Sequence, residues 1–101
     1  MKLVILSVGM PRAAWVFEGC SQYEKRIAKY LPLVWETVPE VRGVKSVEAV
    51  RKKEEERLLQ RIAERDYTVL LDEAGVCRSS RDFSRWLYAC LQSVSGRFLL
   101  V

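Results

Sequence analysis

The chain has 101 residues, of which half are hydrophobic and 30% are charged. This balance suits one globular domain with its own core and excludes a disordered chain. Its 17 Lys and Arg residues outnumber its 13 Asp and Glu residues, a net charge of +4 that permits an anionic partner such as RNA without requiring one. No apolar run reaches about 18 residues, so no membrane span is expected.

Cysteine and histidine content bears on metal binding and on the cellular compartment. The three cysteines, Cys20, Cys77 and Cys90, lack the spacing of metal ligands, and histidine is absent. This composition predicts no metal site and favours reduced thiols in a cytoplasmic protein.

The first half of the chain alternates between two hydrophobic patterns. Residues 3–8 are a continuous apolar run with β-branched side chains, typical of a strand that is buried on both faces. Between residues 16 and 31 apolar residues recur at helical spacing, and Pro32 ends that helix. Residues 33–38 predict a second strand, which Pro39 closes.

The second half repeats the alternation. Ser46 can cap a helix that runs to about Arg65. The middle of this helix is charged, which indicates a solvated face rather than an RNA-binding one. Residues 67–71 predict a third strand. A capping pattern at Ser79 begins a third helix with the strongest apolar stripe of the chain, and residues 97–101 predict a fourth strand.

The order β-α-β-α-β-α-β predicts an α/β fold, a doubly wound and mainly parallel sheet with helices on both faces. Trp15, near a helix start, is the tryptophan expected at the surface. The largely buried side chains are expected to be Leu6, Ile27, Leu70, Phe83, Trp86, Leu87 and Leu100.

Polar residues follow the third predicted strand, at the sheet edge where ligands bind in open α/β folds. Asp72 or Glu73 could accept hydrogen bonds from a ribose or serve as acid or base, and a solvated turn is the alternative. Gly9 follows the first strand without the further glycines of a dinucleotide loop, which favours a simple turn. The chain stops where the fourth strand should lead into another such loop.

Landmarks with a characteristic order and spacing extend over essentially all 101 residues. They are Met1-Lys2-Leu3, Val8-Gly9, Trp15-Val16, Tyr23-Glu24-Lys25-Arg26, Val38-Pro39, Lys53-Glu54-Glu55, Leu58-Leu59, Val69-Leu70-Leu71-Asp72-Glu73, Gly75, and Ser79-Ser80 with Phe83. Together they resemble the ribosomal RNA large subunit methyltransferase H family of SPOUT-class, trefoil-knotted enzymes.

The resemblance implies a methyltransferase that uses S-adenosyl-L-methionine and modifies N3 of a pseudouridine in large-subunit (23S) ribosomal RNA. The family acts on assembled ribosomes as a homodimer. A strand-end leucine that contacts the cofactor in the family corresponds to Leu71. Three further residues, Asp72, Glu73 and Gly75, are expected to border the cofactor pocket. The basic residues expected to attract RNA are Arg42 and Lys45. The resemblance assigns no catalytic residue to this chain.

Family members continue with a Gly-Gly-x-x-Gly loop and a C-terminal helix, which tie the knot and hold most of the cofactor. Residues 1–101 are therefore expected to form an incomplete SPOUT (α/β-knot) domain, truncated before the glycine-rich loop. Alone, it should be inactive and bind the cofactor weakly or not at all. An unpaired sheet edge would favour a homo-oligomer. The alternative function is a non-catalytic α/β module that self-associates through that edge.

Overall fold

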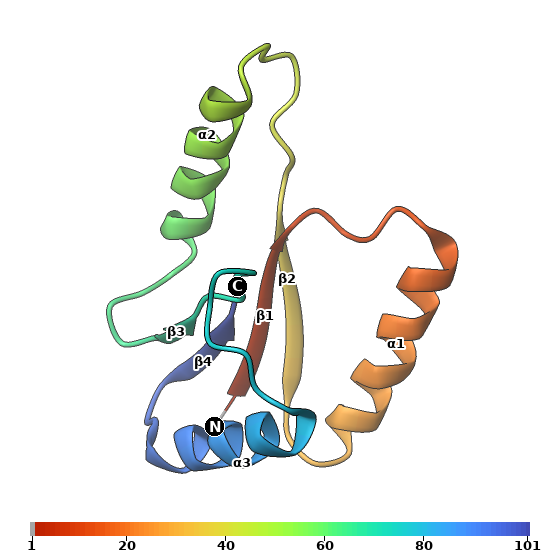
Figure 1. Cartoon of the computed structure of the whole chain (residues 1–101), viewed down its shortest axis with the longest axis vertical. Coiled ribbons are helices and arrows are strands. Elements are labelled where there is room, and N and C mark those ends of the chain that lie inside the picture. The colour runs from red at the N-terminus through yellow and green to blue at the C-terminus, as the bar shows by residue number, and fades with distance from the viewer. Residues whose placement is uncertain (1) are drawn as a thin grey trace.

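The computed structural model describes residues 2–101, and strands alternate with helices along this whole length (Figure 1). In chain order the elements are β1 (Lys2–Val8), α1 (Ala14–Ala28), β2 (Leu33–Val38), α2 (Val47–Gln60), β3 (Tyr67–Val69), α3 (Ser80–Ser93) and β4 (Arg97–Leu100). The predicted alternation is confirmed. Of the residues described, none forms a helix long and apolar enough to cross a membrane.

The strands lie in the order β2-β1-β4-β3, and every neighbouring pair is parallel. β1 lies inside the sheet, where Val4 is opposite Val34 on one side and Leu99 on the other. Helices cover both faces of these central strands, which explains why their apolar runs are continuous rather than alternating. The predicted doubly wound, mainly parallel α/β fold is confirmed.

α3 covers one face of the sheet. Because successive strand residues point to opposite faces, Leu3, Phe98 and Leu100 all face this helix. They form a buried cluster with Leu91 of α3. Phe98 is fully buried, and the Trp86 ring meets it edge-on, with 6.3 Å between the ring centroids. The apolar stripe predicted for this helix therefore holds it against the sheet.

α2 covers the opposite face with a thinner apolar contact. A second buried cluster consists of Val4, Leu6, Val38 and Leu99 in the sheet. The side chains that pack against it include Leu58 of α2 and Ile62 just after that helix. The charged middle of the helix is exposed at Arg51, Lys52, Lys53, Glu55 and Glu56. The solvated face predicted for α2 is therefore confirmed, and the helix depends on its C-terminal turn for apolar contact.

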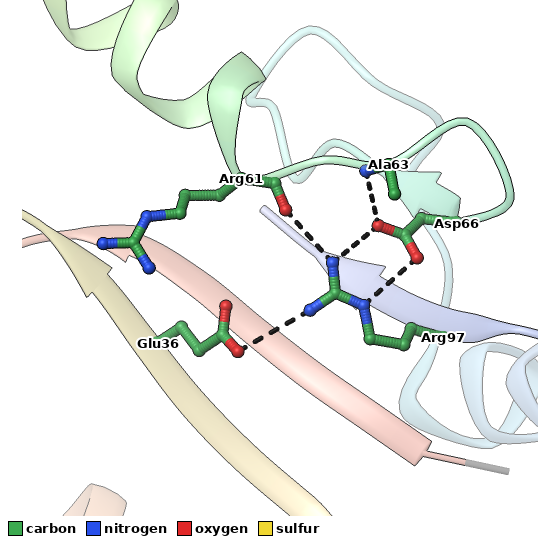
Figure 2. Close-up of polar contacts among 5 residues, drawn as sticks. All are labelled: Glu36, Arg61, Ala63, Asp66 and Arg97. Atoms are coloured by element: carbon green, nitrogen blue, oxygen red, sulfur yellow. Dashed lines mark hydrogen bonds and ion pairs between the residues drawn. The ribbon is translucent and has the colours of Figure 1, made fainter.

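The Arg97 side chain ties the end of α2 to β4 (Figure 2). Its Nη2 atom donates to the Asp66 carboxylate at 2.7 Å and to the Arg61 carbonyl oxygen at 3.1 Å. The Asp66 carboxylate also accepts from the backbone N–H of Ala63 at 2.7 Å. This local turn competes with further helical hydrogen bonds, so α2 ends earlier than predicted.

The burial predictions are only partly right. Leu6 and Leu100 are buried as expected. The side chains that are partly buried rather than fully buried are Ile27, Phe83, Trp86 and Leu87. The prediction for Leu70 is wrong, because its side chain is 68% exposed. β3 is an edge strand that ends at Val69, before this residue, and α2 packs over the central strands instead.

α1 packs more loosely than its sequence pattern predicts. Of its 15 described residues, none is buried. Tyr23, within α1, and Tyr30, just after its end, are both well exposed. Trp15 is exposed as well, which confirms its predicted surface position.

Candidate functional site

Parallel strands place all their carboxyl ends at one edge of the sheet, where the loops after β1, β2 and β3 begin (Figure 1). Two hollows lie at this edge. One, the β3–α3 cavity, has a volume of about 440 Å³ and lies between the end of β3 and the start of α3. The other, the β1–β2 cavity, has a volume of about 430 Å³ and lies between the loops that follow β1 and β2.

The β3–α3 cavity brings together three of the four residues predicted to border a cofactor. Leu71, Asp72 and Gly75 line it, whereas Glu73 does not and is exposed. Leu71 is fixed by its backbone, because its N–H donates to the Val101 carbonyl oxygen at 2.9 Å. Its side chain is thereby left free to contact a ligand at the cavity surface.

A tight turn shapes the outer rim of this cavity. The Gly75 N–H donates to the Asp72 carbonyl oxygen at 3.0 Å. A Cβ atom at Gly75 would lie 3.1 Å from that same oxygen, so a larger residue would require the turn to shift by a few tenths of an ångström. The Asp72 carboxylate makes only a long contact, 3.5 Å, with the Ala74 N–H and can therefore accept hydrogen bonds from a ligand.

α3 supplies an aromatic wall that sequence reasoning assigned only to the core. Phe83 and Trp86 line the cavity, with 5.8 Å between their ring centroids. The Arg78 guanidinium lies 5.3 Å from the centre of the Trp86 ring. Ser79 caps the helix by accepting from the Asp82 N–H at 3.1 Å. Sequence reasoning did not single out Arg78. Its place in the loop after a predicted strand, one residue before the capping Ser79, could have marked it as a site residue.

The β1–β2 cavity is lined by two arginines and one carboxylate. Arg12 Nη2 lies 2.5 Å from Glu40 Oε2, and Arg42 Nη2 lies 3.8 Å from the same oxygen. Of the two residues predicted to attract RNA, Arg42 lines this cavity. Lys45 is exposed but is not among the lining residues. Arg12 was not singled out from the sequence, because nothing near it in the chain reveals its partner.

Comparison with known proteins points in one direction. Residues 1–101 match a family model described as "Predicted SPOUT methyltransferase". The chain is 36% identical over 102 residues to the ribosomal RNA large subunit methyltransferase H of Cytophaga hutchinsonii, and the match covers 100% of this chain and 66% of that protein. Its identity to the protein of the same name from Parabacteroides distasonis is 31% over 103 residues, with the same coverage.

A shorter match, to the ribosomal RNA large subunit methyltransferase H of Geotalea daltonii, has 37% identity over 87 residues and covers 86% of this chain and 56% of that protein. The chain thus spans 66% or less of the length of these relatives. Its family model matches it from the first residue to the last, and the parallel α/β sheet agrees with that assignment. The chain therefore belongs to the SPOUT methyltransferase family.

Proposed function

We propose that this protein is an S-adenosyl-L-methionine-dependent methyltransferase that acts on N3 of a pseudouridine in large-subunit ribosomal RNA. The observation that carries the proposal is the convergence of Leu71, Asp72 and Gly75 on one cavity, in a chain that belongs to the SPOUT methyltransferase family. Relatives named ribosomal RNA large subunit methyltransferase H support the RNA substrate.

The β3–α3 cavity fits S-adenosylmethionine in size and in chemistry. Its volume of about 440 Å³ is within the range of about 300–1,000 Å³ that small-molecule sites have. The Phe83 and Trp86 rings offer apolar surface to an adenine, and the Asp72 carboxylate can accept hydrogen bonds from ribose hydroxyls. The absence of a side chain at Gly75 lets a ligand approach the backbone of the turn closely.

When bound, S-adenosylmethionine supplies an electrophilic methyl group. The role proposed for this chain is to bind and orient that cofactor. Leu71 and Val76 are 60% and 82% exposed, so a ligand over them would remove apolar surface from water. Glu73 is exposed and follows Asp72 in the chain, and its proposed role is to attract the cationic end of the ligand through its charge.

The same exposure argues for weak affinity. Every residue from 70 to 80 is exposed, so this wall of the cavity leaves much of a ligand in water. We expect a dissociation constant between about 100 µM and a few millimolar, weaker than the micromolar values typical of cofactor sites. The inactivity expected for the 101-residue chain by itself remains a prediction, which an assay of methyl transfer to ribosomal subunits tests.

The proposal includes RNA attraction by Arg42 and Lys45, self-association, and a cytoplasmic location. The net charge of +4 supports the first. Exposed apolar residues on α1 and beyond β3, such as Trp15, Leu70 and Val76, support the second. The three free cysteines, Cys20, Cys77 and Cys90, suit the reducing conditions where ribosomes work.

A titration of the ¹⁵N-labelled chain with S-adenosylmethionine, followed by NMR, tests the cofactor site. The largest shifts should appear at the backbone amides of residues 71–80 and at the indole N–H of Trp86. Asp72→Asn should weaken binding about tenfold, because it removes a charged acceptor. Glu55→Gln, on the exposed face of α2, should leave the affinity unchanged. Shifts confined to other surfaces, or no saturable shift at millimolar ligand, would refute this cofactor site.

A further inference from the structure

Two guanidinium groups converge on one carboxylate in the β1–β2 cavity. Arg12 and Arg42 approach the same Glu40 oxygen, at 2.5 and 3.8 Å, and their side chains are 77% and 83% exposed. The Glu40 side chain is less exposed, at 31%. The cluster carries one net positive charge, and both cations are open to solvent.

Backbone geometry and hydrogen bonds hold this arrangement in place. Gly9 has a φ of +70°, and its N–H donates to the Val38 carbonyl oxygen at 2.9 Å, which joins the ends of β1 and β2. A Cβ atom at Gly9 would lie 3.2 Å from Glu40 Oε1, so glycine allows the carboxylate to sit against the backbone. Arg57 of α2 donates to the Pro39 carbonyl oxygen at 2.7 Å and holds the start of the loop that follows β2.

We propose that this cavity binds a phosphodiester group of the RNA substrate between Arg12 and Arg42, with Glu40 as an internal counterion that the phosphate displaces. The inference rests on the RNA substrate of the proposed function. It adds Arg12 as a residue that binds RNA and Glu40 as a residue that competes with the phosphate for the two arginines. In the absence of RNA, the carboxylate keeps the two guanidinium groups converged on one point.

The chemistry of the cluster favours an RNA backbone as the ligand. Guanidinium groups form paired, charge-assisted hydrogen bonds to phosphate oxygens. The cavity opens at the surface, beyond the ends of β1 and β2, so a long chain can pass across it. Met10 and Pro39 also line it and offer apolar surface to a sugar. A phosphate that enters must compete with Glu40 for both arginines, which limits the affinity for small anions.

Fluorescence anisotropy with a labelled single-stranded RNA of twelve nucleotides, at several salt concentrations, tests the site in the 101-residue chain. Arg12→Gln and Arg42→Gln should each weaken binding about fivefold and lower the salt dependence by about 0.7, the effect of one lost phosphate contact. Arg51→Gln, an exposed arginine of α2, should change affinity less than twofold. Glu40→Gln should tighten binding about threefold, because the internal competitor loses its charge.

Three results would overturn the inference. Arg12→Gln and Arg42→Gln could behave like Arg51→Gln, Glu40→Gln could weaken binding, or inorganic phosphate could displace the RNA at low millimolar concentration. Circular dichroism of each variant establishes that it is folded, so a loss of binding cannot be attributed to unfolding.

The outcome is separable from that of the cofactor site. Arg12→Gln, Arg42→Gln and Glu40→Gln should leave the S-adenosylmethionine titration unchanged, since they lie in a different cavity. If the wild-type chain fails to bind S-adenosylmethionine but shows this pattern with RNA, the proposed cofactor site fails and the phosphate site stands. If it binds S-adenosylmethionine and the arginine variants match the control, the phosphate site fails alone.

Discussion

Arg97 donates two parallel hydrogen bonds to the Asp66 carboxylate, from Nε at 3.1 Å and from Nη2 at 2.7 Å (Figure 2). The Asp66 side chain is only 4% exposed, whereas Arg97 is 30% exposed and also lies 3.6 Å from Glu36 of β2. One arginine of β4 thus joins three parts of the chain: β2, the last turn of α2 and the loop before β3. This network compensates for the thin apolar contact of α2.

Asp66→Asn should lower the free energy of unfolding by about 2 kcal/mol, since it removes the nearer of the two carboxylates that pair with the Arg97 guanidinium. This expected loss is smaller than the loss of about 3–5 kcal/mol found when a fully buried pair is broken, because Arg97 remains accessible to water. Urea unfolding followed by circular dichroism measures it. Glu40→Gln breaks the exposed pair with Arg12 and should cost less than about 1 kcal/mol. Equal losses for the two variants would contradict the special weight given to Asp66.

The same pair should make stability depend on pH in the acid range. Hydrogen bonds from Arg97 hold the pKa of Asp66 below its ordinary value of 3.8, against burial, which alone would raise it. Between the lowered folded pKa and the unfolded one, the unfolded chain binds the extra proton, so stability rises with pH. The contribution is complete above about pH 4 and is lost as pH falls through the folded pKa.

Unfolding curves for the wild type and Asp66→Asn from pH 7 down to about pH 2 test this sign. The difference in stability between the two proteins should be constant at neutral pH and shrink below about pH 4. A difference that grows on acidification would show that Asp66 is not stabilised as a carboxylate.

Trp86→Ala should cost about 2–3 kcal/mol, at or below the low end of the range for deletion of a buried aromatic side chain. The ring packs against Phe98 and Phe83 but is only half-buried at the β3–α3 cavity. Tyr88→Ala is the matched control on the same helix, where the ring is 67% exposed, and should cost less than about 0.5 kcal/mol. Thermal or urea unfolding of the two variants gives the comparison. A smaller loss for Trp86→Ala than for Tyr88→Ala would mean that the helix is rotated.

The sequence was a good guide where the signal is local. β2 has the predicted bounds of residues 33–38, because a short apolar run between Pro32 and Pro39 has little freedom to shift. Capping by Ser46 and Ser79 was likewise confirmed, since a hydroxyl and the N–H three residues on are neighbours in any helix start.

Features that depend on the order of the strands in the sheet could not be predicted from the sequence. Leu70 was expected in the core, but an apolar run does not reveal that its strand lies at the edge of the sheet. Arg12 and Glu40 meet only because β1 and β2 pair in parallel with Val8 opposite Val38. For the same reason, Arg97 could not be matched with Asp66 before the register of β4 was known.

Substitution of glycine by alanine should have opposite effects on stability at two positions of the chain. Gly19 lies within α1, and a Cβ atom there would have none of the described atoms within 4 Å. Gly19→Ala should therefore stabilise the protein by about 0.5–1 kcal/mol, because alanine loses less backbone entropy in a helix. Gly96 precedes β4, and its Cβ atom would lie 2.8 Å from the Arg65 carbonyl oxygen.

Gly96→Ala should destabilise the protein by about 1–3 kcal/mol, because the clash is with backbone and must shift the α2–β3 loop or the start of β4. That shift would also disturb the neighbouring Arg97–Asp66 pair, so Gly96→Ala combined with Asp66→Asn should cost less than the sum of the two single changes. Urea unfolding of Gly19→Ala, Gly96→Ala and the double variant measures all three effects. A strictly additive double variant would show that the clash at Gly96 is relieved without moving Arg97.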